Sequence, residues 1–121
     1  MTYPTLKIIH ITGLALLFMG LTGVLASKYA GESTIRKRWL FHASHGIGML
    51  LVLASGIGLG LQLGVTHPAP FWIIAKFGIW LLAGSAMILA IRFSRFAAII
   101  LFYFAALVYA AAWLAINKPS L

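Results

Sequence analysis

Four long runs of apolar residues dominate the chain, and short segments with charged residues, glycine or proline separate them. An α-helix rises about 1.5 Å per residue, so roughly 20 apolar residues cross a hydrocarbon core about 30 Å thick. Each run is long enough for one crossing. The pattern therefore predicts four membrane-spanning helices, at about residues 6–26, 39–64, 71–91 and 96–116.

The connecting segments are short and contain residues that end helices. Pro68 and Pro70 stand between the second and third runs, and proline lacks a backbone donor and fixes φ. Asn117-Lys118-Pro119 ends the fourth run. Short connections place consecutive helices side by side and antiparallel. We therefore expect an all-α membrane protein, a single domain formed by an up-down-up-down four-helix bundle.

The amino-acid composition also indicates a membrane protein. Of the 121 residues, 63% are hydrophobic and 8% are charged, which is too little polar surface for a soluble domain of this size. The expected surroundings are a lipid bilayer. The net charge of +8 is also typical of nucleic-acid binding. However, the basic residues lie in the short loops, where membrane topology places them, so we expect no nucleic-acid partner.

The basic residues also predict an orientation, because short cytoplasmic loops carry an excess of Lys and Arg. The first and third loops contain Lys28, Arg36, Lys37, Arg38, Arg92 and Arg95, whereas the other side has only Lys7 and Lys118. This bias places both hairpin loops in the cytoplasm and both termini outside. A bacterial inner membrane is the expected location.

Ionisable residues inside apolar spans are the candidates for function, because they are costly there. Lys76 lies roughly 9 Å below the outer end of its helix and His10 roughly 6 Å, so the two share a depth. The only acidic residue, Glu32, belongs to the first loop and cannot neutralise Lys76. Either Lys76 reaches the headgroups with its long stem, or it faces an anion, a porphyrin propionate or a metal.

Two further histidines belong to the opposite leaflet. His42 and His45 are three residues apart and share a helix face near the inner start of the second helix. Imidazole is a common haem ligand, so His45 is a candidate for a second haem, with Tyr103 or Met87 at similar depth. Alternatively both histidines are interfacial, and for His42 we favour contact with lipid phosphate. His67 in the proline turn is expected to be solvated.

Other chemistries are excluded by residues that the chain lacks. It contains no cysteine and no aspartate, which excludes thiolate metal sites, Ser-His-Asp catalysis and paired-carboxylate chemistry. Glycine is abundant, and Gly56 and Gly60 form a small-xxx-small pair. Such a pair permits packing within the bundle, close approach of a flat cofactor, or contact with a second copy of the chain.

Several short motifs resemble two families of small membrane proteins. These motifs are Leu6-Lys7-Ile8-Ile9-His10-Ile11, Arg36-Lys37-Arg38-Trp39, Ser55-Gly56-Ile57-Gly58-Leu59, Trp72-Ile73-Ile74-Ala75-Lys76-Phe77 and Asn117-Lys118-Pro119. One family is the HemJ-type membrane protoporphyrinogen oxidases, and the other is the SirB-like family. In the oxidases a histidine on the first helix and a lysine on the third are associated with haem and activity. The resemblance implies those roles for His10 and Lys76.

Two functions stay open at this point. The first is a redox protein that binds haem b through His10, Lys76 and His45, with His10 and His45 as the metal ligands. It would oxidise a porphyrin-like substrate or exchange electrons with a quinone. The second is a non-enzymatic accessory or assembly subunit, whose glycine-rich faces dock a second copy or another membrane protein. Catalytic residues cannot be assigned from the sequence.

Overall fold

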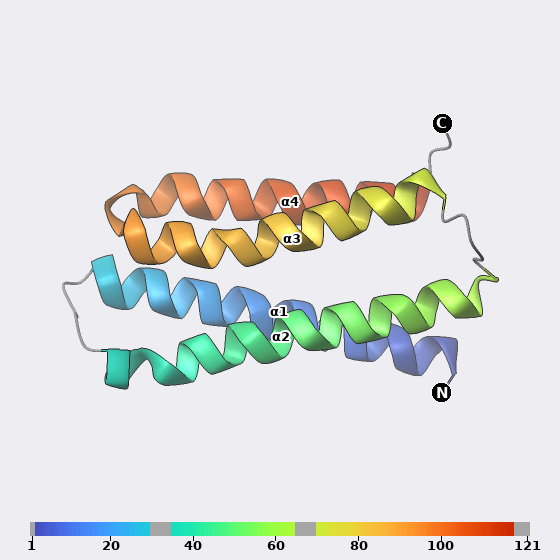
Figure 1. The fold of residues 1–121 in the computed structure, drawn as a ribbon, viewed down its shortest axis with the longest axis horizontal. Coiled ribbons are helices and arrows are strands. Elements are labelled where there is room, and N and C mark those ends of the chain that lie inside the picture. Colours follow the sequence, from blue (N-terminus) through green and yellow to red (C-terminus); the bar gives the residue numbers. More distant parts are fainter. Residues whose placement is uncertain (1, 30–34, 65–69, 118–121) are drawn as a thin grey trace.

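The computed structural model describes residues 2–29, 35–64 and 70–117, with the backbone alone for residues 35–38. They form the helices α1 (Tyr3–Tyr29), α2 (Ile35–Gln62), α3 (Phe71–Arg92) and α4 (Ala97–Asn117), and a 3-10 turn η1 (Ser94–Phe96) (Figure 1). Each of the four α-helices is long and apolar enough to cross a membrane. No strand occurs in these ranges. The predicted all-α, four-helix fold is confirmed.

The helix ends differ from the expected ones by a few residues. The first helix begins at Tyr3 instead of residue 6, because Pro4 lies in its first turn, where proline is tolerated. The second begins at Ile35, four residues before the expected start, so the basic segment belongs to the helix. The third begins directly after Pro70, as predicted. Glu32, Lys118 and all but the last residue of the predicted turn at 65–70, including His67, lie outside the described residues.

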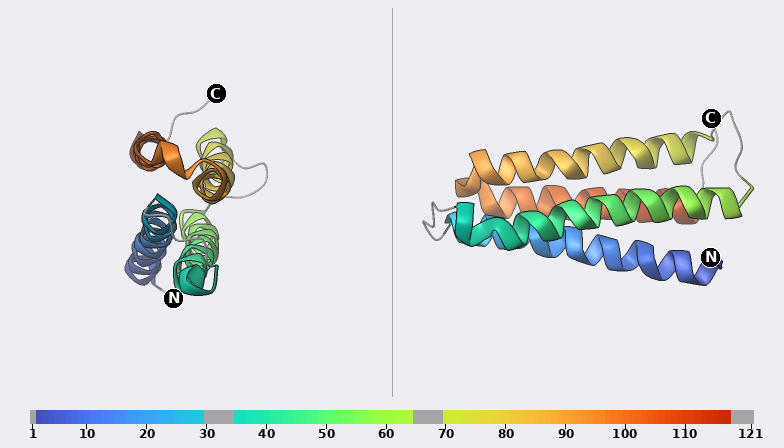
Figure 2. Two further views of the ribbon diagram at one scale, coloured as in Figure 1. Left: turned by 90° about the vertical axis from the view of Figure 1, so that its left-hand side faces the viewer. Right: turned by 60° about the horizontal axis from the view of Figure 1, so that its bottom comes forward.

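The helices form two antiparallel hairpins, α1 with α2 and α3 with α4 (Figure 2). The first hairpin is the more closely packed. Glycines explain this: a Cβ on Gly13 would lie 2.8 Å from the Leu51 Cβ, and one on Gly48 would lie 2.6 Å from the Gly13 carbonyl oxygen. Because these positions carry no side chain, the two backbones touch.

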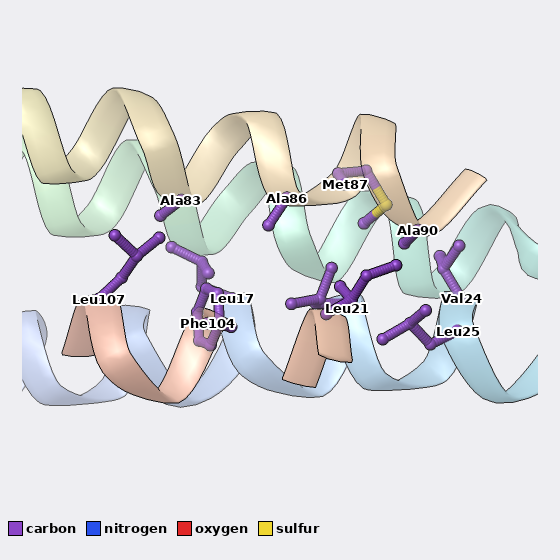
Figure 3. Close-up of a cluster of buried hydrophobic side chains, with 11 residues drawn as sticks. Leu17, Leu21, Val24, Leu25, Ala83, Ala86, Met87, Ala90, Phe104 and Leu107 are labelled. Atoms are coloured by element: carbon purple, nitrogen blue, oxygen red, sulfur yellow. The ribbon is translucent and has the colours of Figure 1, made fainter. Parts of the chain in front are cut away.

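The core lies between the two hairpins at the end that carries η1 (Figures 1 and 3). Leu21, Val24 and Leu25 of α1 are almost fully buried there. They face small residues of α3, including Ala86 and Ala90, which let the hairpins approach closely. Figure 1 shows the hairpins separating from this end toward the end with the N- and C-termini. The splayed half contains the candidate site.

Large apolar side chains cover the outside of the bundle. Those exposed by at least half include Ile8, Leu50, Ile74, Ile88, Ile99 and Phe102. A water-soluble protein of this size rarely exposes so much contiguous apolar surface. Lipid tails are the medium that suits this surface, in agreement with the spans.

Candidate ligand-binding groove

A groove of about 600 Å³ lies between the two hairpins in their splayed half, and all four helices line it. Its volume falls in the range of about 300–1,000 Å³ that is typical of small-molecule sites. Most of its wall is apolar, and α4 contributes small residues, Ala111, Ala112 and Ala115. The ionisable residues on its wall include Lys7, His10 and Lys76. The arrangement suits a ligand that is mostly apolar and carries a few polar groups.

His10 projects from α1 into the contact with α2. It follows the helix start by seven residues, about 10 Å along the axis, and is half-buried. Its Nδ1 lies 2.9 Å from Ser55 Oγ of α2. Ser55 Oγ in turn donates to the carbonyl oxygen of Leu51, one turn earlier. The imidazole is therefore held by a hydrogen bond that crosses from one helix to the other.

Lys76 reaches the same groove from α3. It follows Phe71 by five residues, about 7.5 Å along the axis, and is half-buried. It lies close enough to His10 for the two side chains to interact electrostatically. The structure gives its ammonium no hydrogen bond or ion pair within the described residues. Both residues thus line one groove at similar depth, and the roles predicted for them stay predictions.

Gly56 and Gly60 lie on the wall of the groove instead of at the tight contact between the helices. A Cβ on Gly56 would lie 3.6 Å from His10 Cε1, and one on Gly60 would lie 3.8 Å from the Ile73 Cδ1. Neither position touches another backbone. The pair therefore leaves room for the imidazole and for the groove.

Trp80 links the hairpins on the wall of the groove. Its indole Nε1 donates a hydrogen bond of 3.0 Å to the carbonyl oxygen of Met49 on α2. Its ring stacks on Phe77, with 5.6 Å between the ring centroids. No role was predicted for Trp80 from the sequence. A signal was present, because the N–H of a buried tryptophan usually finds a partner.

The groove opens near the start of α1. There Lys7 is exposed, and its Nζ lies 5.5 Å from the centre of the Tyr3 ring. Lys7 precedes His10 by almost one helical turn, so the groove has one cation at its mouth and a second, Lys76, further in. Both cations would favour a ligand with negative charge.

His45 belongs to a different environment. Only 6% of its surface is exposed, and its Nδ1 donates to the Leu17 carbonyl oxygen at 3.2 Å. Its Nε2 is buried without a hydrogen-bond partner in the described part of the chain. His45 is not among the residues that line the groove. The structure thus keeps it apart from His10, and its predicted role as a haem ligand stays a prediction.

Other predicted neighbours of His45 are part of the core. Met87 is buried in the core cluster and Tyr103 packs against it. His42 is half-buried and interacts electrostatically with His45. Across the described ranges, no three histidine, cysteine or acidic side chains gather in a way that would hold a metal ion.

These features define a class of protein: a small four-helix membrane protein with an apolar, cation-containing groove inside the spans. Residues 3–119 match the sequence profile of the family described as "Invasion gene expression up-regulator, SirB". The match covers nearly the whole chain, so this protein belongs to the SirB family. No curated protein and no solved structure matches it. The SirB resemblance is thereby confirmed, and the likeness to the HemJ-type oxidases stays a resemblance.

Proposed function

We propose that this protein binds haem b in the groove between its hairpins and acts as a redox protein of the bacterial inner membrane. One observation carries the proposal. An imidazole, His10, and an amine that has no carboxylate partner among the described residues, Lys76, line the same apolar groove. An unpaired ammonium in a membrane span is costly, so a bound anion would stabilise it.

The residues present fit haem. The macrocycle is flat and apolar, in keeping with the groove's apolar wall and the room left by Gly56 and Gly60. His10 would supply an imidazole ligand to the iron. Lys76, with Lys7 at the mouth, would hold the propionates by charge-assisted hydrogen bonds. Bound haem would supply one-electron chemistry, and a quinone or a porphyrin-like molecule dissolved in the bilayer would be the redox partner.

The same reasoning supports His10 rather than His45 as the ligand of the first proposed haem. The Nε2 of His45 has less than 1 Å² of accessible surface, so a macrocycle there would have to open the core. The groove beside His10 needs no such rearrangement. A second haem at His45 would therefore require the core around its ring to open.

The alternative, an accessory subunit that docks through glycine faces, has less support. Gly13, Gly20 and Gly48 make the tight contacts, and all of these are between α1 and α2 of the same chain. Those glycines are therefore occupied within the hairpin. The predicted homo-oligomer stays a prediction.

The test is an absorption spectrum of the purified protein, oxidised and reduced, after expression with ample haem. We expect a Soret band that shifts or disappears in His10→Ala and persists in the control His42→Ala, because His42 does not line the groove. A colourless wild-type protein would contradict haem binding. An unchanged spectrum in His10→Ala would instead remove His10 as the ligand.

A further inference from the structure

We propose that Ser55 is a positioning residue: it keeps the proton of the His10 imidazole on Nδ1 and so leaves Nε2 as the atom that binds a ligand. Sequence analysis gave Ser55 no role beyond its place in a short motif. The identity of the ligand rests on the proposed function. The position of the proton does not, because it follows from contacts within the protein.

The surroundings of Ser55 determine where its hydroxyl proton points. Ser55 is 2% exposed, so water does not compete for its Oγ. The Oγ donates to the Leu51 carbonyl oxygen and lies 3.3 Å from that of Val52. Both neighbours can only accept, and a hydroxyl has one proton. With its one proton pointing to Leu51, a carbonyl oxygen of its own helix, the Oγ presents a lone pair toward His10.

The contact with Ser55 in turn determines which ring nitrogen of His10 carries the proton. With Ser55 Oγ as an acceptor 2.9 Å away, Nδ1 must be the donor. The carbonyl oxygen of Val52 is a second acceptor beside the ring. A neutral imidazole has only one N–H, so Nε2 carries the lone pair.

The orientation of the His10 ring is fixed by its contacts with α2. The ideal Cβ position of Gly56 lies 3.6 Å from Cε1 of His10 and 3.9 Å from its Nδ1, so this edge of the ring lies against α2. Gly56 thus supplies the space and Ser55 the hydrogen bond. Hydrogen-bonded partners of this kind fix the ring of a metal-binding histidine and raise the basicity of its ligand nitrogen. Ser55 therefore prepares Nε2 before any ligand arrives.

The experiment reads the tautomer directly, in the ligand-free protein. Histidine labelled with ¹⁵N gives distinct chemical shifts for protonated and unprotonated ring nitrogens, and His10→Gln assigns the His10 signals. We expect Nδ1–H in the wild type, a mixture with Nε2–H in Ser55→Ala, and recovery of Nδ1–H in Ser55→Thr, which keeps the hydroxyl. Nε2–H in the wild type, or unchanged Nδ1–H in Ser55→Ala, would overturn the proposal.

A second readout separates this inference from haem binding. In the haem-loaded protein, Ser55→Ala should hold haem about ten-fold less tightly and show a higher reduction potential, because its imidazole is a poorer donor. Ser55→Thr should restore both. Equal affinity and potential in Ser55→Ala and the wild type would overturn the positioning role. If the wild type binds no haem, the proposed function fails, and the tautomer measurement still decides the role of Ser55.

Discussion

At the scale of single residues, two histidines each place Nδ1 against an oxygen atom of the neighbouring helix, but their rings lie in different surroundings. His10 and His45 both use Nδ1 to cross the contact between α1 and α2, one toward Ser55 Oγ and the other toward the Leu17 carbonyl oxygen. The ring of His10 lies on the wall of a groove, whereas the Nε2 of His45 is enclosed in the core. A histidine in a span thus becomes a candidate ligand only where the helices around it separate.

Lys76 permits a prediction that does not depend on the identity of the ligand. Replacing it in Lys76→Met removes a half-buried ammonium that has no hydrogen-bond or ion-pair partner in the described ranges, and keeps the apolar stem. The ligand-free protein in detergent should become more stable by about 1 kcal/mol or more, which raises Tm by several degrees. Thermal unfolding of haem-free protein measures the change, and haem retention should fall in the same variant.

The matched control is Lys7→Met, which changes an exposed lysine at the groove mouth. Its effect on stability should be small, within about 0.5 kcal/mol, because its ammonium is already solvated. The competing interpretation, in which Lys76 reaches the headgroups, makes the opposite forecast. A Lys76→Met protein that is no more stable than the wild type would favour that interpretation.

At the scale of helices, neighbouring glycines on α2 provide a sharp comparison. A Cβ on Gly48 would meet the backbone nitrogen of Leu17 and lie 2.6 Å from the Gly13 carbonyl oxygen, whereas one on Gly46 would meet nothing within 4 Å. Gly48→Ala should therefore push the helices apart and lower the free energy of unfolding by about 1–3 kcal/mol. Gly46→Ala should be neutral or stabilising by up to about 1 kcal/mol, because alanine favours the helix.

Equilibrium unfolding of both variants in mixed micelles, followed by circular dichroism, gives the two values. Equal stability of Gly48→Ala and Gly46→Ala would show that the close contact between α1 and α2 is not formed. Since His10 and Ser55 meet across the same contact, that result would also weaken the assignment of the groove.

The helices could be predicted from the sequence because the thickness of a bilayer fixes how many apolar residues each one needs. The first and last residues of each helix were harder to predict. A helix continues past the hydrocarbon into the headgroups, as α2 does by starting at Ile35, and hydropathy does not record that extension. The start at Phe71 was predictable because Pro70 acts locally.

The sequence was enough to predict how deep in the membrane the residues of the candidate site lie, but not which side chains they contact. Counting residues from the helix ends was enough to place His10 and Lys76 at one level, and both line the groove. The contact of His10 with Ser55 and that of Trp80 with Met49 depend on how each helix is rotated about its axis. That rotation is set by the glycine contacts between neighbours, and the hydrophobic pattern of a helix that is apolar all round does not reveal it.

At the scale of the whole molecule, the groove exists because the two hairpins pack at one end and separate at the other (Figure 1). The closed end holds the core, from Leu17 to Leu25 on α1 and from Ala83 to Ala90 on α3. The open end holds His10, Lys76 and Lys7. The proposed ligand, if charged or bulky, would enter from the compartment at the open end, and the orientation of the chain in the membrane decides which compartment that is.

The orientation itself is a prediction that single cysteines can test, because the chain has no native cysteine. Thr2 and Leu63 lie at the end with the groove mouth, and Tyr29 and Ser94 at the opposite end. The excess of Lys and Arg at the latter end predicts that it is cytoplasmic. A membrane-impermeant maleimide should therefore label Thr2→Cys and Leu63→Cys in intact cells, and Tyr29→Cys and Ser94→Cys only after the cells are opened.

The result bears directly on the redox proposal. If the expected ends are labelled, His10 and Lys76 lie in the outer half of the membrane, and the proposed haem would reach the groove from outside the cytoplasm or from the outer leaflet. The reverse pattern would place the same groove next to the cytoplasm, where haem is made, and would contradict the positive-inside assignment. Labelling of both ends in intact cells would mean that the chain inserts both ways. In that case six basic residues against two would not be enough to orient this bundle.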